Sequence, residues 1–336
     1  MLAMGCVIEA QRTKLYPMLL EPNLHTKVWG STGLTQWKNL PEQDHIGESW
    51  EVSAVDSAPS IVANGTWTGY PLIDVIRKMP EAILGKAVAK RHANQLPILV
   101  KLIDTNDDLS VQVHPDNDMA QRLHNQLGKS EMWYVIDAQP GASIYAGFKD
   151  ELTPEQYAQK VADGTILEAL AKHEVHAGDV FYLPAGRIHS IGTGCFIAEI
   201  QQTSNITYRI YDFGRTGLDG KPRELHTELS KAAIDYTVLP DYKTAYEHKP
   251  NQENEIVDCE YFTTSLYEID QPVSKDMEGL DSFMIVICME GQGELTDDKG
   301  NTVSLRQGET VLLPACTKAF TLTPEGKMKA LTSYIR

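Results

Sequence analysis

The chain has 336 residues, a formal net charge of −16 and 42% hydrophobic residues. This length predicts roughly two domains, and the composition is that of an ordinary globular protein. The acidic balance argues against nucleic acid and anionic membrane surfaces as partners, and no apolar run approaches the roughly 20 residues of a membrane span. A phosphorylated ligand would be repelled at long range, so its site would need concentrated local positive charge.

The N-terminal stretch MLAMGCVIEAQRTKLYP lacks the basic start and the long apolar segment of a signal peptide. We expect residues 1–14 to be a poorly ordered leader. The five cysteines are scattered, and none of them forms a CxxC pair. We interpret them as the reduced thiols of a cytoplasmic protein.

The next elements in chain order are predicted to be strands and then helices. Short alternating runs up to about residue 70 are typical of β-structure. Residues 71–79 and 81–92 have helical spacing, and Pro80 separates them.

The run 96–104 is mostly apolar but contains Lys101, and a buried lysine needs a partner or a water-lined cavity. The stretch LSVQVHPDN, residues 109–117, begins by alternating apolar and polar residues with period two. This alternation predicts a strand that carries Gln112 and His114 on one face. Read alone, such a polar face would more often be in contact with water.

The middle of the chain is predicted to be β-structure with one helical segment. Residues 131–148 read as two strands joined by a turn, and residues 175–202 as a strand, a turn and another strand. Between them, residues 153–173 read as helical, with Thr153 as the N-cap and a break near Gly164.

The segment 239–255 is polar and contains proline, and the chain is β-rich again from about residue 256. We therefore expect a first domain at 15–238, a linker at 239–255 and a second domain at 256–336.

An internal similarity links these two domains. Residues 178–190, GDVFYLPAGRIHS, align without gaps on residues 308–320, GETVLLPACTKAF. His189 meets Ala319 in this alignment. The match predicts two β-units of one architecture, of which only the first has the histidine.

The turn before His189 carries a recognisable motif. Residues 178–189 have the form G-x5-P-x-G-x2-H, which resembles the second sequence motif of the cupin superfamily of small β-barrels. In that superfamily the histidine points into the barrel as a metal ligand. The resemblance has one departure here, because Thr193 stands where cupins usually have asparagine.

The first cupin motif, H-x-H followed later by glutamate, has its counterpart in Gln112, His114 and Glu131. The glutamine and the wider gap to Glu131 depart from the general cupin pattern. Together with KVWG, GESWEVSA, GKSEMWYVID and ITYRIYDFGR, they closely resemble the type I mannose-6-phosphate isomerases in their short bacterial form. The resemblance covers most of residues 20–235, and beyond that region it rests on overall layout.

The resemblance implies a mainly β fold of two cupin-like double-stranded β-helix (jelly-roll) barrels with a small helical insertion. The first domain, 15–238, is expected to be catalytic and to include the helical segments near 71–92 and 153–173. The second domain, 256–336, is expected to be cupin-like and metal-free.

The resemblance also implies one metal ion per chain, Zn²⁺ or another divalent metal, bound by Gln112, His114, Glu131 and His189. The first two share a strand face, and the last two are expected on neighbouring strands. Glutamate supplies the only negative charge, so ion and ligands keep a formal charge of about +1, which suits an enediolate. Taken singly, the first three residues would more often be solvated or turn residues, and His189 a hydrogen-bonded core histidine.

The resemblance further implies that Arg209 faces the phosphate or the reacting oxygens of the substrate, since arginine suits a planar anionic partner. Lys129 and Lys101 match two lysines of the family, and Ser110 shares the strand face of Gln112. The alternatives are a surface ion pair for Arg209 and ordinary solvated positions for the other three. Five histidines fit no ligand pattern and receive no role: His124, His173, His176, His226 and His248.

These residues imply a metal-dependent aldose–ketose isomerase that interconverts mannose 6-phosphate and fructose 6-phosphate through an enediol. The proton carrier stays open: Lys129 or Lys101 with a lowered pKa, or a bound water. One rival is a non-catalytic sugar-binding or regulatory cupin. Another is an iron-dependent oxygenase, because two histidines and one carboxylate remain when Gln112 is set aside. We expect a small phosphosugar as the partner, and a monomer or weak homodimer.

Overall fold

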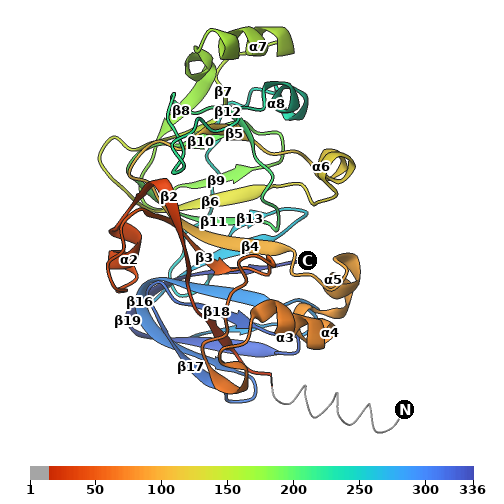
Figure 1. The fold of residues 1–336 in the computed structure, drawn as a ribbon. Helices are drawn as coiled ribbons and strands as arrows, with labels where there is room; N and C mark the ends of the chain where they lie inside the picture. The colour runs from red at the N-terminus through yellow and green to blue at the C-terminus, as the bar shows by residue number, and fades with distance from the viewer. Residues whose placement is uncertain (1–14) are drawn as a thin grey trace. The chain divides into compact units, whose positions relative to one another are not determined.

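The computed structural model describes residues 15–336, which form three β-sheets and several short helices (Figure 1). The mainly β class expected from the sequence is confirmed. The expectations for residues 1–14 and for Cys6 lie outside the described residues. Within residues 15–336, no helix combines the length and the apolar character needed to cross a bilayer.

The chain divides into two compact units that are interleaved along the sequence. Of the described residues, unit 1 comprises 15–23, Trp50–Leu99 and Tyr246–Arg336, and unit 2 comprises Leu24–Ser49 and Val100–Ala245. The expected domains, by contrast, were continuous segments separated by a linker at 239–255. Those boundaries stay a prediction, and so does the arrangement as two barrels.

Unit 1 is built on an eight-stranded antiparallel sheet. The strand order is β1-β18-β16-β19-β14-β13, with β15 also paired to β19 and β17 to β16. The strands are β1 (Met18–Leu20), β13 (Glu253–Asp258), β14 (Thr263–Ile269), β15 (Val273–Asp276), β16 (Met284–Asp297), β17 (Thr302–Arg306), β18 (Thr310–Leu313) and β19 (Ala319–Tyr334).

One face of this sheet packs into an apolar core. On β16, Met284, Val286 and Cys288 are fully buried at every second position, and Leu322 and Ala330 of β19 join the same cluster. Among the described residues, the buried members of this cluster include no histidine and no carboxylate. This cluster therefore stabilises unit 1 mainly through burial of apolar surface.

We expect the segment 256–336 to bind no metal. Ala319 begins its strand as His189 begins the matching strand in unit 2, and the sequence holds no histidine after His248. Anomalous X-ray scattering from crystals of the metal-loaded protein should locate the metal in unit 2 alone. A transition metal bound by residues of 256–336 would contradict this expectation.

The helices of unit 1 differ from the predicted pair by one additional break, at Gly85. They are α3 (Leu72–Lys78), α4 (Pro80–Leu84) and α5 (Lys86–Arg91), preceded by the 3-10 helix η1 (Gly65–Trp67). Gly85 has a φ of +95°, and a Cβ atom there would lie 1.9 Å from the carbonyl oxygen of Asp281. The Asp281 carboxylate accepts hydrogen bonds of 2.8 Å from the N–H groups of Lys86 and Ala87, which begins a new helix. The local sequence pattern could not reveal this cap, because Asp281 is distant in the chain.

Unit 2 contains a five-stranded sheet and most of a six-stranded sheet. The first has the order β12-β5-β10-β7-β8, and the second has the order β2-β3-β4-β11-β6-β9. The five-stranded sheet consists of β5 (Val111–Val113), β7 (Ser143–Phe148), β8 (Leu170–Glu174), β10 (His189–Ile191) and β12 (Tyr208–Tyr211). The six-stranded sheet consists of β2 (Asn23–Ser31), β3 (Ile46–Val52), β4 (Ile98–Asp104), β6 (Glu131–Ala138), β9 (Val180–Leu183) and β11 (Cys195–Gln202).

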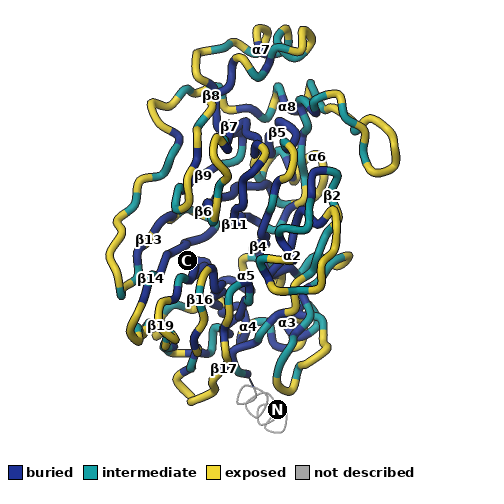
Figure 2. The backbone as a smooth tube through the Cα atoms, turned by 90° about the vertical axis from the view of Figure 1, so that its left-hand side faces the viewer, coloured by how far each residue is buried: buried dark blue, intermediate teal, exposed yellow. Residues whose placement is uncertain are grey.

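The helices of unit 2 are α2 (Gly33–Trp37), α6 (Asn117–His124), α7 (Pro154–Ala162), the 3-10 helix η2 (Ile166–Ala169) and α8 (Thr227–Ala233). All eight residues of β11 are buried, whereas most residues of α7 are exposed or half-buried (Figure 2). Charged residues on such a strand must face other polar groups inside the unit.

The predicted helical segment 153–173 is only partly helical. Thr153 caps α7 as expected, and its side chain accepts a hydrogen bond from the N–H of Gln156. The helix ends at Ala162, near Gly164, which has a φ of +70°. The prediction is wrong for residues 170–173, because Leu170–Glu174 form β8 and pair with β7. Tertiary pairing outweighs the helical spacing of this stretch.

The internal similarity between 178–190 and 308–320 is confirmed at the level of local structure. The aligned strands β9 and β18 occupy matching positions, and His189 and Ala319 are each the first residue of the strand that follows. Gly178 and Gly308 both adopt positive φ, at 93° and 81°. The two segments therefore turn and extend in the same way.

Candidate active site

A row of three residues crosses the three strands β12, β5 and β10 at one edge of the five-stranded sheet. Gln112 on β5 is paired directly with His189 on β10 and, on its other side, with Arg209 on β12. Directly opposite residues of antiparallel strands share a face of the sheet. The three side chains therefore lie on one face, although they are distant in sequence. His114 follows immediately after β5.

The carboxylate side of the site comes from the six-stranded sheet. Glu131 is the first residue of β6, and β6 pairs with β11 so that Trp133 lies opposite Glu199. The expectation of neighbouring strands is therefore confirmed for His189, whose strand β10 pairs with β5, and wrong for Glu131, whose strand β6 belongs to the other sheet. The turn after β6 passes the chain from one sheet to the other, so β6 and β7 do not form a hairpin.

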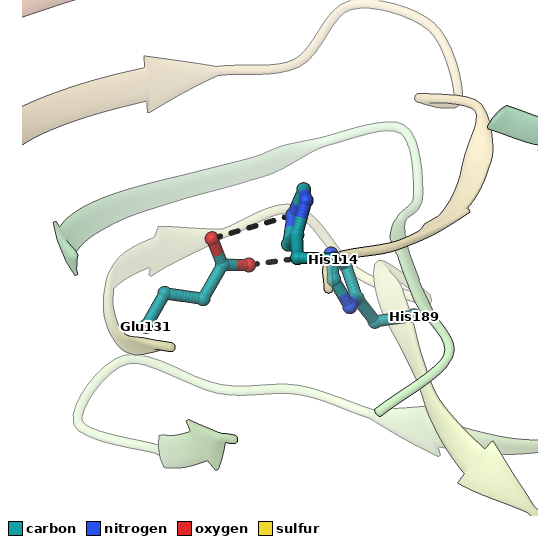
Figure 3. A group of neighbouring side chains, drawn as sticks. All are labelled: His114, Glu131 and His189. Atoms are coloured by element: carbon teal, nitrogen blue, oxygen red, sulfur yellow. Dashed lines mark ion pairs between the residues drawn. The ribbon is translucent and has the colours of Figure 1, made fainter. Parts of the chain in front are cut away.

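Side chains from the two sheets meet in a buried cluster of His114, Glu131 and His189 (Figure 3). The Nε2 atom of His189 lies 3.3 Å from Glu131 Oε1, and the Nε2 atom of His114 lies 3.7 Å from Glu131 Oε2. One ligand atom of each residue lies within 4.8 Å of the others. The cluster can therefore hold a metal ion.

Backbone carbonyls fix the orientation of both imidazoles. His114 Nδ1 lies 2.7 Å from the carbonyl oxygen of Ile206, and His189 Nδ1 lies 2.8 Å from that of Arg187. Each Nδ1–H therefore donates to a carbonyl, which leaves the Nε2 lone pair directed at Glu131. Burial lowers the pKa of His114 well below its usual range and that of His189 to about 4, so both rings are neutral at pH 7.

Glu131 provides an observation that favours a cation at this position. Within residues 15–336, its buried Oε1 accepts no hydrogen bond, whereas Oε2 is ion-paired with Lys129 Nζ at 2.6 Å. Lys129 Nζ also lies 3.2 Å from His114 Nε2, so positive charge already sits beside these two residues. Burial and the charge of Glu199 raise the pKa of Glu131 to about 7. Buried polar atoms normally have partners, so the free oxygen Oε1 beside the Nε2 atom of His189 belongs to a donor set that fits a divalent metal.

Gln112 adjoins the cluster. Its Nε2 atom lies 3.3 Å from the Nε2 atom of His189. Rotation of the amide by half a turn exchanges Nε2 and Oε1 and presents an oxygen to the same position. The geometry is consistent with Gln112 as a fourth ligand, and the ligand set stays a prediction.

A cavity of about 150 Å³ in unit 2 has Gln112 in its wall. It is lined by four other residues singled out in the sequence: Lys101, Ser110, Lys129 and Arg209. Sequence reasoning missed five polar residues of the same wall: Lys27, Glu48, Glu199, Thr207 and Arg223. The structure therefore brings all the expected binding residues to one cavity and adds two carboxylates to its lining.

Glu199 is the most enclosed of the missed residues. One oxygen accepts a 2.9 Å hydrogen bond from Trp133 Nε1, and the other lies 3.3 Å from Lys101 Nζ and 3.8 Å from Lys129 Nζ. Burial alone would raise the pKa of Glu199, but the two lysines outweigh it, so the pKa is lowered. The sequence signal was a lone carboxylate in the apolar strand CFIAEIQQ, which mirrors the lone Lys101 in LPILVKLID.

Lys129 has anionic rather than cationic surroundings. Burial lowers its pKa, but Glu131 and Glu199 outweigh this effect, so the pKa is raised. The expectation that Lys129 has a lowered pKa is therefore wrong, since it assumed a site dominated by positive charge. Lys129 is placed to hold negative charge.

Arg209 lies at the other end of the cavity. Its Nη1 donates a 3.1 Å hydrogen bond to the carbonyl oxygen of Glu224, and its Nε has no partner within residues 15–336. Burial and the nearby Arg223 lower the pKa of Arg209. Arg223 itself is bound through Nε and Nη2 to the carboxylate of Asp212. This arrangement favours a cation that awaits an anionic partner over a surface ion pair.

Two family models match the chain. Residues 18–139 match "Phosphomannose isomerase type I, catalytic domain", and residues 252–335 match "Mannose-6-phosphate isomerase, cupin domain". Fold and site together thus define an isomerase with a cupin domain and a buried His–Glu–His cluster.

Full-length similarity identifies the family. The chain is 34% identical over 321 residues to the mannose-6-phosphate isomerase of Streptococcus mutans, covering 95% of this chain and 98% of the relative. It is 30% identical over 322 residues to mannose-6-phosphate isomerase ManA of Bacillus subtilis, covering 95% and 99%. The crystal structure of the mannose 6-phosphate isomerase from Bacillus subtilis superposes with a TM-score of 0.86 at 30% identity, covering 96% of this chain and 100% of that one. The chain therefore belongs to the mannose-6-phosphate isomerase family.

Proposed function

We propose that the protein is a metal-dependent aldose–ketose isomerase that interconverts mannose 6-phosphate and fructose 6-phosphate through an enediol. Its family supports the isomerase activity and the substrate. The observation that carries the metal dependence is the buried carboxylate of Glu131, whose Oε1 has no hydrogen-bond partner within residues 15–336 and faces the Nε2 atom of His189, with the Nε2 atom of His114 nearby.

The proposed metal is one Zn²⁺ per chain, held by Gln112, His114, Glu131 and His189. Two nitrogen and two oxygen donors suit this ion, although other divalent metals accept the same set. When bound, the ion supplies a Lewis acid that polarises the sugar oxygens at C1 and C2.

The proposed base is Glu199. It is the more deeply buried of the two carboxylates that line the cavity, 3% exposed against 8% for Glu48, and its lowered pKa keeps it ionised at pH 7. In the direction from mannose 6-phosphate, Glu199 Oε1 takes the proton from C2 and returns it to C1, while the O2 hydroxyl proton passes to O1. Lys101 and Lys129 hold the negative charge that develops on the enediolate.

The proposed phosphate or enediolate contact is Arg209, with Ser110 on the neighbouring wall. The net charge of −16 repels a dianionic sugar phosphate at long range, so cations concentrated at one cavity must hold it. Arg209 and Arg223 both line the cavity and supply such a concentration.

Glu199→Gln is expected to lower kcat by about 10²-fold to 10⁴-fold, the range for loss of a general base. The amide retains the shape and can still accept the hydrogen bond from Trp133 Nε1, but it cannot accept the substrate proton. Metal content is expected to be unchanged. Glu48→Gln, at the other carboxylate of the cavity wall, is the matched control and should have a much smaller effect on kcat. Steady-state kinetics on mannose 6-phosphate measures both variants, and near-normal kcat in Glu199→Gln would contradict the assignment.

A coupled isomerase assay combined with metal analysis of the purified protein tests the proposal as a whole. We expect turnover of mannose 6-phosphate that is lost on chelation and restored by Zn²⁺. Sugar binding without turnover would favour the non-catalytic rival. Bound iron with substrate-dependent oxygen consumption would favour the oxygenase.

A further inference from the structure

Arg209 lies on an open and irregular part of the five-stranded sheet. Its strand, β12, is the edge strand, and the register of its pairing with β5 shifts between Arg209 and Tyr211. An edge strand presents unpaired N–H and C=O groups on its outer side, and an irregular ladder bends the strand. The ladder with β5 is therefore not sufficient to fix the backbone at Arg209.

His226 occupies the outer side of the strand at this position. The N–H of His226 donates a 2.7 Å hydrogen bond to the carbonyl oxygen of Arg209, and the N–H of Arg209 donates a 3.2 Å bond to His226 Nδ1. The two residues thus exchange a pair of hydrogen bonds, as opposite residues of antiparallel strands do, with a ring nitrogen in place of one carbonyl. The same segment also contacts the side chain, since Glu224 offers its carbonyl oxygen to Arg209 Nη1 at 3.1 Å.

His226 is itself firmly held. It immediately precedes α8, and its carbonyl oxygen accepts a 2.9 Å hydrogen bond from the N–H of Ser230. Ser230 is fully buried, and its Oγ lies 2.8 Å from the hydroxyl of Tyr157 on α7. His226 therefore connects a packed helix pair to the backbone of Arg209.

The Arg209 side chain depends on this connection. Within residues 15–336, its Nε has no hydrogen-bond partner, and the bond from Nη1 to Glu224 belongs to the same segment as His226. The direction in which the guanidinium enters the cavity is consequently set by the backbone at Arg209 and by residues 224–226. We propose that His226 is a positioning residue that directs Arg209 into the cavity, an inference that rests on the proposed role of Arg209.

Three substitutions of His226 separate this role from a general effect on folding. Asparagine places Oδ1 two bonds from Cβ, where histidine has Nδ1, and so retains the acceptor. Glutamine is polar and similar in size, but its acceptor is one bond farther away, and leucine has none. His124→Leu is the matched control, because His124 Nε2 contacts the hydroxyl of the adjacent Tyr208 at 2.8 Å without touching Arg209.

Steady-state kinetics, metal analysis and thermal unfolding of each full-length variant form the test. We expect His226→Gln and His226→Leu to lose about 10-fold to 100-fold in kcat, the range for a misplaced catalytic group. We expect His226→Asn to recover most of this loss and His124→Leu to stay close to the parent enzyme. Metal content should be the same throughout. Equal kcat and equal KM in the Asn, Gln and Leu variants would overturn the inference, and the Gln variant keeps the test decisive should leucine prevent folding.

A double substitution shows whether His226 acts through Arg209. In the Arg209→Lys background, His226→Gln should change kcat little further, because the group that it directs has already been replaced. Losses that simply multiply would overturn the inference. An Arg209→Lys enzyme with unchanged kinetics is a different result, since it would overturn the proposed role of Arg209 itself and with it the basis of the inference.

Discussion

His189→Ala is expected to abolish metal binding and turnover while the fold persists. The Nε2 atom of His189 is one of two imidazole donors at the cluster, 3.3 Å from Glu131 Oε1. With only His114 and Glu131 left as the other members of the His–Glu–His cluster, binding of a divalent ion becomes weak. The surrounding apolar core loses the edge contact between His189 and Trp133, but its other members, which include Phe181 and Ile197, keep their contacts and stabilise the unit.

Elemental analysis, circular dichroism and the isomerase assay measure this outcome. His173→Ala is a suitable control, because His173 lies in the same unit but contacts the rings of Phe181 and Tyr242 rather than Glu131. The control should retain metal and activity. Full metal occupancy with normal turnover in His189→Ala would show that His189 is a core histidine and not a ligand.

Arg209→Lys is expected to lower kcat by about 10²-fold or more, as for loss of one donor to an oxyanion. Lysine keeps the positive charge but lacks the planar fork of the guanidinium, so it cannot make the same paired contacts. Metal content should stay normal, because Arg209 is not in the proposed ligand set.

The kinetic parameters of this variant also distinguish two roles. If Arg209 only grips phosphate in the ground state, KM should rise with kcat nearly unchanged. If it stabilises charge in the transition state, kcat should fall as stated above. Unchanged kcat and KM would leave Arg209 without a part in the reaction.

The family resemblance named the cluster residues, and local patterns placed some of them. The period of two predicted that Gln112 lies on a strand, and the structure has it on β5, opposite His189 on β10. The same patterns could not say which sheet each strand joins, because a turn between two strands is compatible both with a hairpin and with a passage between sheets. For this reason Glu131 was expected on a strand next to that of Gln112, whereas it approaches from the other sheet.

The other features of the site depend on distances between side chains, and these cannot be read from the sequence. Glu199 could be recognised as a site residue only from the structure, in which its carboxylate lies close to the ammonium groups of Lys101 and Lys129. The raised pKa of Lys129 follows from those same distances, since burial by itself acts in the opposite direction. His226 matched no ligand motif and attracted no attention in the sequence, because its contact to Arg209 is with the backbone.

The pairing of Gln112 with both His189 and Arg209 has a consequence for substrate size. His189 and Arg209 lie two strands apart, so about 10 Å separates their backbones, a distance set by main-chain hydrogen bonds. If Arg209 holds the phosphate, the metal side of the cavity takes the C1–C2 end of the sugar and the arginine side takes the other end. Substitution of side chains changes the chemistry at either end of the cavity. It does not change the distance between the backbones of His189 and Arg209. Adaptation to a longer or shorter phosphosugar therefore calls for a change in the strands themselves, such as an inserted or deleted residue in β5.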